Sequence, residues 1–298
     1  MREIIHIQDR KSYPPLSLAV GFFDGLHSGH QFLLRECRNS SALPAVLTFS
    51  KDWKGVKEEE TDLLLTEDEK EEMLSRFGIE KELVLPFDRK TMETSVEDFL
   101  SFLLSLNVRK LVVGQDFTFG RYGKGKAEDL GVLKEKGIEV VILPLLKSEE
   151  GKVSTTLIKK LLLDKKIEEA DRLLSYPFFY EGKVIHGLHN GHKLGFPTAN
   201  MELEKDKLTL PKGVYRTRTI IDGKSYSSMT NIGNHPTLSP LCKDIAETSI
   251  FNLDADLYGK EIKVEFLSFL REQQNFPSVE ALVEQLRKDK ENCLKDNQ

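Results

Sequence analysis

The stretch that decides the fold reads Gly21-Phe22-Phe23-Asp24-Gly25-Leu26-His27-Ser28-Gly29-His30. An apolar run over residues 16–22 leads into it and predicts a buried strand, and residues 30–37 have helical character. In open α/β sheets, ligands bind beyond the carboxyl ends of the strands, and the free amides of a helix N-terminus attract phosphate. We therefore expect a phosphate-binding turn between this strand and this helix.

Two histidines mark that turn as a candidate site. His27 and His30 are three residues apart, so both side chains can reach the same phosphate group, while Gly21 and Gly25 let the backbone come close. The alternative is a glycine-rich turn with two surface histidines, which is less favoured because two of the chain's seven histidines fall in one turn. A zinc site is disfavoured because no third ligand lies nearby.

The rest of the N-terminal half alternates strand and helix patterns. Further strands are predicted at residues 45–49, 82–86, 110–114 and 138–143. Capping boxes at Thr66 to Glu69 and at Thr94 to Glu97 predict two helix starts, the first helix ending at Gly78, and one helical stretch is expected over residues 154–174. Strands that alternate with helices in this way predict a parallel sheet with helices packed on it.

The C-terminal half has a different texture. Short strand patterns occur at residues 178–185, 213–221, 225–232, 247–253 and 263–270, with turn residues between them and a final helix at residues 278–288. Several short strands in succession indicate a small barrel or sandwich. We expect an α/β domain over residues 1–176, followed over residues 177–298 by a mainly β domain, a small antiparallel barrel with a terminal helix.

Composition limits the class of protein. The chain has 298 residues, a formal net charge of −5 and 39% hydrophobic residues, so it can bury a core and lacks the basic balance of a dedicated nucleic-acid binder. Cys37, Cys242 and Cys293 are scattered, and no CxxC pair suggests zinc or a disulfide framework. No apolar run approaches a membrane span, and the N-terminus does not read as a secretory signal, so we expect a cytoplasmic protein. The oligomeric state is not readable.

The histidine turn resembles the HxGH signature of the nucleotidylyltransferase superfamily, and its longer form, GxFDGxHxGH, resembles the FAD synthetase branch. The resemblance implies a Rossmann-like parallel sheet that binds ATP. It also implies that His27 and His30 hold ATP phosphates and stabilise charge in the transition state, without a covalent intermediate. The same turn would supply four further ATP-binding residues: Gly21, Phe22, Asp24 and Gly25.

Two more segments carry this resemblance. Residues 114–120 resemble the G-x-D/N-F-x-F-G segment of the family, which implies that Asp116 and Phe117 line the flavin site. Residues 154–159 resemble its S-S-T-x-I-R phosphate motif, although Leu157 stands where an arginine is common. This motif would add to the ATP site four residues: Ser154, Thr155, Thr156 and Lys159. Taken alone, the two segments are a flexible loop and a helix cap.

The C-terminal half carries a second signature, Gly195-Phe196-Pro197-Thr198-Ala199-Asn200. Thr198 and Asn200 are two apart, so both point to one face of a strand, and their oxygens suit Mg²⁺. PTAN after a glycine resembles the flavokinase signature. This resemblance implies that Thr198 and Asn200 hold Mg²⁺, that Glu247 is the catalytic base, and that the remaining contacts come from Gly187 and Gly195 to ATP and from Arg271 to the flavin.

Together the motifs resemble the bifunctional prokaryotic riboflavin kinases/FMN adenylyltransferases. The resemblance implies that ATP phosphorylates riboflavin to FMN and that a second ATP adenylylates FMN to FAD, with Mg²⁺ and with riboflavin, FMN and ATP as the only partners. Two alternatives stay open at this point. One is a transferase with another acceptor, such as a pantetheine or nicotinamide phosphate, and the other is a flavin-sensing protein without turnover.

Overall fold

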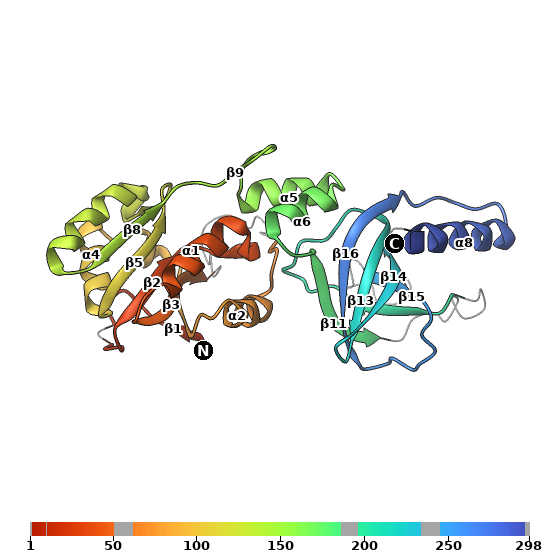
Figure 1. The fold of residues 1–298 in the computed structure, drawn as a ribbon, viewed down its shortest axis with the longest axis horizontal. Coiled ribbons are helices and arrows are strands. Elements are labelled where there is room, and N and C mark those ends of the chain that lie inside the picture. Colours follow the sequence, from red (N-terminus) through yellow and green to blue (C-terminus); the bar gives the residue numbers. More distant parts are fainter. Residues whose placement is uncertain (1, 10, 51–61, 186–195, 234–244, 296–298) are drawn as a thin grey trace. The chain divides into compact units, whose positions relative to one another are not determined.

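The computed structural model describes residues 2–9, 11–50, 62–185, 196–233 and 245–295. The expected contacts from Gly187 and Gly195 therefore lie outside the described residues. The chain divides into two compact units, Met1–Thr155 and Thr156–Gln298, which appear in Figure 1 as an α/β part and a mainly β part. The domain boundary expected near residue 176 stays a prediction.

The first unit is built on a parallel sheet whose strand order is β1-β4-β3-β2-β5-β8. The strands span Arg2–Ile4 (β1), Leu16–Val20 (β2), Leu43–Ser50 (β3), Lys81–Pro86 (β4), Val108–Gly114 (β5) and Glu139–Leu143 (β8). Every neighbouring pair is parallel. β2 is apolar except for Ser17 and is buried along its whole length, as expected of a central strand covered on both faces.

Helices cover both faces of this sheet. They span Ser28–Arg38 (α1), Glu67–Arg76 (α2), Arg89–Met92 (α3) and Val96–Ser105 (α4), with a 3₁₀ segment at Ala127–Lys136 (η3). One face packs on α4 and η3 through a continuous apolar core that includes Leu18, Leu47 and Phe102. The other face meets α1, where the Ser17 hydroxyl donates to the carbonyl of Cys37 over 2.6 Å.

Two expectations about helix boundaries meet different outcomes. The Thr66 capping box is confirmed, because the Thr66 hydroxyl accepts from the Glu69 amide and the Glu69 carboxylate accepts from the Thr66 amide. The box expected at Thr94 is wrong by one residue: Ser95 caps α4 by accepting from the Asp98 amide over 3.0 Å. The Thr94 hydroxyl instead donates to the carbonyl of Lys90, in the preceding helix α3.

The helix expected over residues 154–174 is in fact two helices, Thr155–Leu163 (α5) and Ile167–Leu174 (α6). Lys165 lies between them with φ of 63°, in the left-handed region that ends helices. The amides of Lys165 and Lys166 fold back onto the carbonyls of Leu162 and Leu161. The helix pattern is therefore continuous in sequence but interrupted in the backbone.

The second unit is a closed barrel of antiparallel strands in the order β11-β12-β15-β14-β13-β16. The strands span Phe179–Ile185 (β11), Thr198–Glu202 (β12), Gly213–Ile221 (β13), Lys224–Gly233 (β14), Ile245–Ile250 (β15) and Glu261–Arg271 (β16), and the terminal helix α8 spans Val279–Lys295. A small apolar cluster joins α8 to the barrel through Met229, Phe251 and Cys293. The antiparallel barrel with a terminal helix is confirmed (Figure 1).

Candidate functional site

The strand order of the first unit creates a site at the carboxyl ends of β2 and β5. β3, the next strand in the chain, pairs with one edge of β2, whereas β5 pairs with the other edge. The loops that follow β2 and β5 therefore diverge, and ligands bind at such switch points in open α/β sheets. The histidine turn follows β2, and the Asp116–Phe117 segment follows β5.

The turn after β2 depends on glycine at one position. Gly25 has φ of 74°, and a Cβ atom there would lie 2.5 Å from the Leu64 side chain, so the fold itself requires glycine. Gly21 is different, because a Cβ atom there would meet only the Phe23 ring at 3.5 Å, an ordinary contact. The protein's own packing therefore does not require glycine at position 21.

Asp24 fixes the shape of the turn. Its Oδ1 accepts hydrogen bonds from the backbone amides of Leu64 at 2.9 Å and Leu65 at 3.3 Å. Its carbonyl accepts from the Thr155 hydroxyl at 3.1 Å. These contacts join segments that are 40 and 131 residues apart in sequence. Asp24 thus holds the loop, and the first residue of α5, in one arrangement around the site.

His27 and His30 lie with their rings stacked, the centroids 3.6 Å apart and the planes 16° from parallel. His27 caps α1, because its Nδ1 accepts from the His30 amide at 3.3 Å. Burial lowers the pKa of His27 to about 4, and burial together with the neighbouring His27 lowers the pKa of His30 well below its usual value. Both rings are therefore neutral near pH 7, and the proton of His27 resides on Nε2.

The segment after β5 contributes charge and aromatic surface to the same edge. Asp116 forms an ion pair with Lys152, and both charges are close enough to influence the pKa of His27. Phe117 stacks with Phe119 at a centroid distance of 5.9 Å. The structure therefore brings Asp116 together with the histidine turn, as the sequence predicts, while Phe117 is partly engaged in core packing.

The expected phosphate motif is divided between the two units. Ser154 and Thr155 belong to the first unit, and Thr155 contacts the histidine turn through Asp24. Thr156 and Lys159 belong to the second unit, in α5. Contacts of Thr156 and Lys159 with the phosphates stay predictions.

An aromatic cluster at this edge was missed by the sequence reasoning. The rings of Phe22, Phe49 and Phe87 lie with centroids 5.0 to 5.7 Å apart. Each ring stands at or just beyond the carboxyl end of a strand, β2, β3 or β4, and Phe22 is 49% exposed. The available signal was an aromatic residue at the end of three successive parallel strands. An exposed aromatic face of this kind suits a planar ring system.

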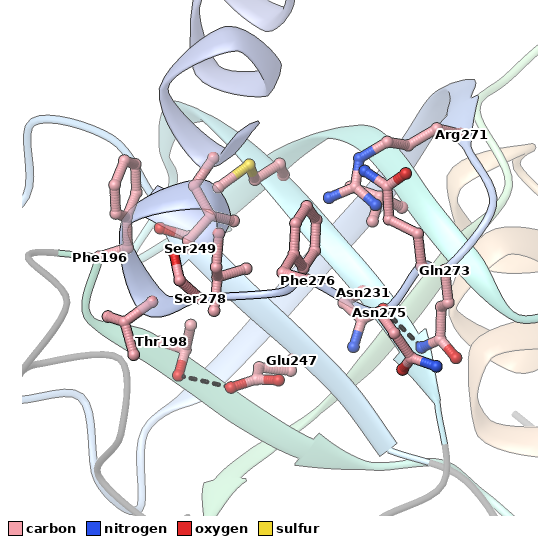
Figure 2. A pocket seen from close by; sticks show the side chains of 16 residues that line it. Phe196, Thr198, Asn231, Glu247, Ser249, Arg271, Gln273, Asn275, Phe276 and Ser278 are labelled. Atoms are coloured by element: carbon pink, nitrogen blue, oxygen red, sulfur yellow. Dashed lines mark hydrogen bonds between the residues drawn. The ribbon is translucent and has the colours of Figure 1, made fainter. Parts of the chain in front are cut away.

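The second unit contains a cavity of about 790 Å³, here called the large cavity. It lies between the barrel and the start of α8, and Figure 2 shows its side chains pointing into a common space. Its lining combines apolar and amide side chains and includes Phe196, Thr198, Asn231, Glu247, Ser249, Arg271, Gln273, Asn275, Phe276 and Ser278.

Thr198 and Glu247 meet in this cavity. The Thr198 hydroxyl donates to Glu247 Oε1 over 3.1 Å, the bond dashed in Figure 2. Glu247 lies opposite Asn200 of β12 and opposite Asn231 of β14 in the strand ladders. Side chains directly opposite in antiparallel strands share a face. The barrel therefore brings Glu247, which the sequence reasoning selected separately, to the same face as Thr198 and Asn200.

Arg271 has a structural partner that the sequence did not reveal. Its guanidinium Nε contacts both carboxylate oxygens of Asp289, at 3.2 and 3.0 Å, and a second nitrogen lies 2.8 Å from Oδ2. Asp289 is buried in α8, so this ion pair ties the helix to β16. Arg271 lines the large cavity, and a contact from Arg271 to a flavin stays a prediction.

Gln273 is a cavity residue that sequence reasoning missed. Its amide donates to Asn231 Oδ1 over 2.8 Å and to the carbonyl of Ile232 over 3.1 Å. It lies just beyond β16 in a segment without a recognisable pattern, so no local signal was available. Together with Asn231, Gln273 provides an amide wall for a ligand with mixed donors and acceptors.

A second cavity of about 240 Å³, here called the small cavity, opens beside the first. Thr198 lines both cavities. The other lining residues of the small cavity are mostly apolar, with carboxylates at Asp254 and Asp256 and an aromatic ring at Tyr258. A group transferred from a ligand in one cavity to a ligand in the other would therefore pass Thr198.

The oxygen atoms near Thr198 fit a hard cation. Hydroxyl, amide and carboxylate oxygens from Thr198, Asn200 and Glu247 are the donor types that Mg²⁺ prefers, with water and substrate phosphates completing its shell. Within the described ranges, no group of three or more His, Cys, Asp and Glu side chains is placed to hold a metal ion. Nor is any described helix both long and apolar enough to cross a membrane.

Comparisons with known proteins match both halves of the chain. The FAD synthetase family model matches residues 9–157, and the riboflavin kinase family model matches residues 174–296. A bifunctional riboflavin kinase/FMN adenylyltransferase of Listeria monocytogenes is 32% identical over 92% of this chain and 90% of its own. The protein of the same description from Bacillus subtilis is 31% identical over 93% of this chain and 91% of its own.

A crystal structure from Streptococcus pneumoniae is also similar, with a TM-score of 0.88, 32% identity and coverage of 98% of this chain and 99% of that one. That protein is named for macrolide efflux, and its likeness is evidence of a shared fold. Two family matches in succession, each on a unit with its own candidate site, agree with full-length relatives of one description. The chain belongs to the family of bifunctional riboflavin kinases/FMN adenylyltransferases.

Proposed function

We propose that this chain converts riboflavin to FAD in two ATP-dependent steps. In the first step, ATP phosphorylates riboflavin and yields FMN and ADP, and in the second, a further ATP adenylylates FMN and yields FAD and pyrophosphate. Riboflavin kinase and FMN adenylyltransferase matches along the one chain support both steps. A cytoplasmic location stays a prediction from the sequence.

The geometry of the second unit supports the kinase step. The large cavity has the amide and apolar lining expected for a flavin, and the small cavity has room for a nucleoside. Thr198 stands where the two cavities meet, and Glu247 lies one hydrogen bond from it. The single observation that carries this assignment is the hydrogen bond from Thr198 to Glu247 where the two cavities meet. Phosphoryl transfer requires an oriented hydroxyl nucleophile, and a carboxylate held at this point can orient the hydroxyl of riboflavin.

In this proposal Glu247 accepts the proton of the terminal ribityl hydroxyl of riboflavin. The hydroxyl oxygen then bonds to the γ-phosphorus of ATP, and ADP leaves with the electron pair of the broken bond. The Thr198 hydroxyl holds the Glu247 carboxylate in place over 3.1 Å. Thr198 and Asn200 would hold Mg²⁺, which when bound supplies positive charge against the phosphates.

In the first unit, a phosphate oxygen of FMN bonds to the α-phosphorus of ATP and pyrophosphate leaves. Neutral His27 and His30 donate hydrogen bonds from their ring nitrogens to the phosphates, so positioning and charge stabilisation carry the rate. Gly21, Phe22 and Asp24 would contact the nucleotide from the turn after β2. The remaining phosphate contacts would come from Gly25, Ser154, Thr155, Thr156 and Lys159.

We further assign the flavin ring of FMN to the aromatic cluster of Phe22, Phe49 and Phe87, with Asp116 and Phe117 as additional flavin contacts from the segment after β5. The close packing of these three rings and the half exposure of Phe22 support this assignment. A transferase with another phosphate acceptor is disfavoured by the riboflavin kinase match in the same chain, which makes FMN available as the acceptor. Flavin sensing without turnover is disfavoured because the Thr198–Glu247 arrangement is intact.

The test separates the two sites. Glu247→Ala should abolish ADP formation from riboflavin and leave FAD formation from FMN intact, because the carboxylate belongs to the second unit. His30→Ala should do the reverse, with adenylyl transfer reduced by about a hundredfold or more. Circular dichroism checks that each variant is folded. If either folded variant lost both activities, the assignment of two separate sites would be wrong.

A further inference from the structure

Two amide side chains in the large cavity hold each other in a fixed orientation. Gln273 Nε2 donates to the carbonyl oxygen of Ile232 over 3.1 Å and to Asn231 Oδ1 over 2.8 Å. A backbone carbonyl only accepts, so it decides which end of the Gln273 amide faces it. With Nε2 fixed in this way, Asn231 must present its oxygen to Gln273. The planar Asn231 amide then directs its nitrogen, Nδ2, away from Gln273.

The packing around this pair depends on a glycine. Gly233 follows Asn231 by two residues on β14, and a Cβ atom there would lie 2.5 Å from Gln273 Nε2. The φ angle of Gly233 is not in the left-handed region, so the backbone itself does not require glycine. Glycine at this position therefore provides the space in which the Gln273 amide lies.

Asn231 Nδ2 keeps both of its hydrogens for a ligand. Within the described part of the chain, the Asn231 side chain makes only the hydrogen bond that its Oδ1 accepts. Asn231 is partly exposed and lines the large cavity. It lies directly opposite Glu247 in the ladder of β14 and β15, so the two side chains share a face. Figure 2 shows Asn231 between Glu247 and Gln273, which places a donor beside the carboxylate.

Glu247 has a second asparagine opposite it, on the other neighbouring strand. Asn200 of β12 pairs with Glu247 on that side, is only 6% exposed and lines neither of the two cavities. Asn231 lies on the side where the large cavity opens. A flavin in the large cavity therefore meets Asn231 and not Asn200.

The donor and the carboxylate together match two neighbouring hydroxyl groups. Side chains directly opposite in antiparallel strands have Cβ atoms about 4.5 to 5.5 Å apart, so the polar ends of Asn231 and Glu247 can contact adjacent oxygens of one ligand. One hydroxyl donates to the Glu247 carboxylate, and the next accepts from Asn231 Nδ2. The ribityl chain of riboflavin ends in such a pair, the terminal 5′ hydroxyl and the 4′ hydroxyl beside it.

We propose that Asn231 binds the 4′ hydroxyl of riboflavin in the kinase step, and that Gln273 is the positioning residue that turns the Asn231 amide toward it. This rests on the proposed function, which assigns the flavin to the large cavity and the terminal hydroxyl to Glu247. Contacts to two neighbouring hydroxyls fix the rotation about the bond between their carbons. The terminal oxygen is thereby oriented before it reacts.

The experiment compares riboflavin with 4′-deoxyriboflavin, which lacks only that hydroxyl. ADP formation from ATP by the full chain gives kcat/KM for each flavin, since adenylyl transfer yields pyrophosphate instead. The wild-type protein should prefer riboflavin by about tenfold, the effect of one lost hydrogen bond. 2′-Deoxyriboflavin is the matched control substrate, because its missing hydroxyl is remote from the terminal one, and its kcat/KM should be within about twofold of that of riboflavin. A wild-type protein that does not discriminate against 4′-deoxyriboflavin would overturn the proposal.

Three variants test the residues. Asn231→Ala removes the donor and should lower the preference for riboflavin over 4′-deoxyriboflavin to about twofold. Gln273→Met keeps the length of the side chain but cannot donate, so the Asn231 amide is free to turn, and the preference should fall to about threefold. Asn275→Ala is the matched control, because it removes another amide of the cavity wall that lies outside the pair, and it should retain the wild-type preference.

The ratio of the two kcat/KM values separates substrate contact from structure. A merely structural role would slow both flavins alike and leave their ratio unchanged. The proposal is overturned if Asn231→Ala or Gln273→Met retains the wild-type preference, or if Asn275→Ala lowers it equally. If a variant does not fold, the wild-type comparison of the three flavins decides. Absence of ADP formation from riboflavin by the wild-type protein would instead overturn the proposed function.

Discussion

At the scale of single residues, the first unit depends on two histidines that burial keeps neutral. Their rings stack at 3.6 Å, and His27 also caps α1. A neutral imidazole can donate one hydrogen bond to a phosphate. Because it carries no charge, its burial avoids the large cost of removing a cation from water. The pair therefore combines a structural role at the helix start with a role toward the ligand.

The lowered pKa of His27 predicts how stability depends on pH. The folded value is about 4 and the ordinary value is 6.5, so between these limits the unfolded chain binds the extra proton. The stabilisation is complete above pH 6.5 and is lost as pH falls through 4, by up to about 1.4 kcal/mol for each pH unit in that window. Urea unfolding followed by circular dichroism from pH 7 to pH 4 measures this slope.

His27→Asn is the matched control, because asparagine also caps helices but does not titrate in this range. The difference in free energy of unfolding between wild type and His27→Asn should shift in favour of the variant as the pH falls. A difference that stays constant from pH 7 to pH 4 would contradict the buried, neutral state of His27.

The sequence could locate these histidines but could not predict their burial or their protonation state. A glycine-rich turn between a strand and a helix is a local pattern, so His27 and His30 could be selected from it. Their burial depends on the fold around the turn, which Asp24 anchors to residues such as Leu64, forty positions away. The same holds for Gln273, whose place in the large cavity depends on closure of the barrel.

At the scale of elements, the terminal helix α8 is attached by a buried ion pair. Arg271 of β16 and Asp289 of α8 make this contact, and α8 also provides part of the large cavity. Removing one member of a buried pair leaves the other charge uncompensated, which is more harmful than losing an exposed pair. The helix thus links the stability of the second unit to the shape of its cavity.

Asp289→Asn should lower the free energy of unfolding of the second unit by about 3 kcal/mol. It should also raise the KM for riboflavin and leave FAD formation from FMN unchanged, because α8 lies in the second unit. Chemical denaturation and the two separate assays measure these effects. Glu284→Gln removes an ion pair with Lys288 on the exposed side of the same helix, and should change none of them. Equal effects of the two variants would refute the role given to the buried pair.

Element boundaries show where sequence reasoning stops. The strands β2, β3, β4 and β5 were predictable because their apolar runs are continuous and buried. β1 was missed because it has only three residues and gains its order by pairing with β4, some 80 positions away. The break between α5 and α6 was missed because Lys165 adopts a left-handed conformation without a glycine to announce it.

At the scale of the whole molecule, two units of different architecture each carry a candidate site. The parallel sheet holds the histidine turn, and the barrel holds the Thr198–Glu247 pair. The product of the barrel's reaction, FMN, is the acceptor in the other unit's reaction. One chain therefore suffices for the conversion of riboflavin to FAD.

The measurement that tests this claim most directly is a time course. The purified full chain is incubated with riboflavin, ATP and Mg²⁺, and the flavins are separated by chromatography. The account predicts that FMN appears first and FAD later. ADP should be released as FMN forms, and pyrophosphate as FAD forms. FMN without FAD, or neither product from a folded protein, would contradict it.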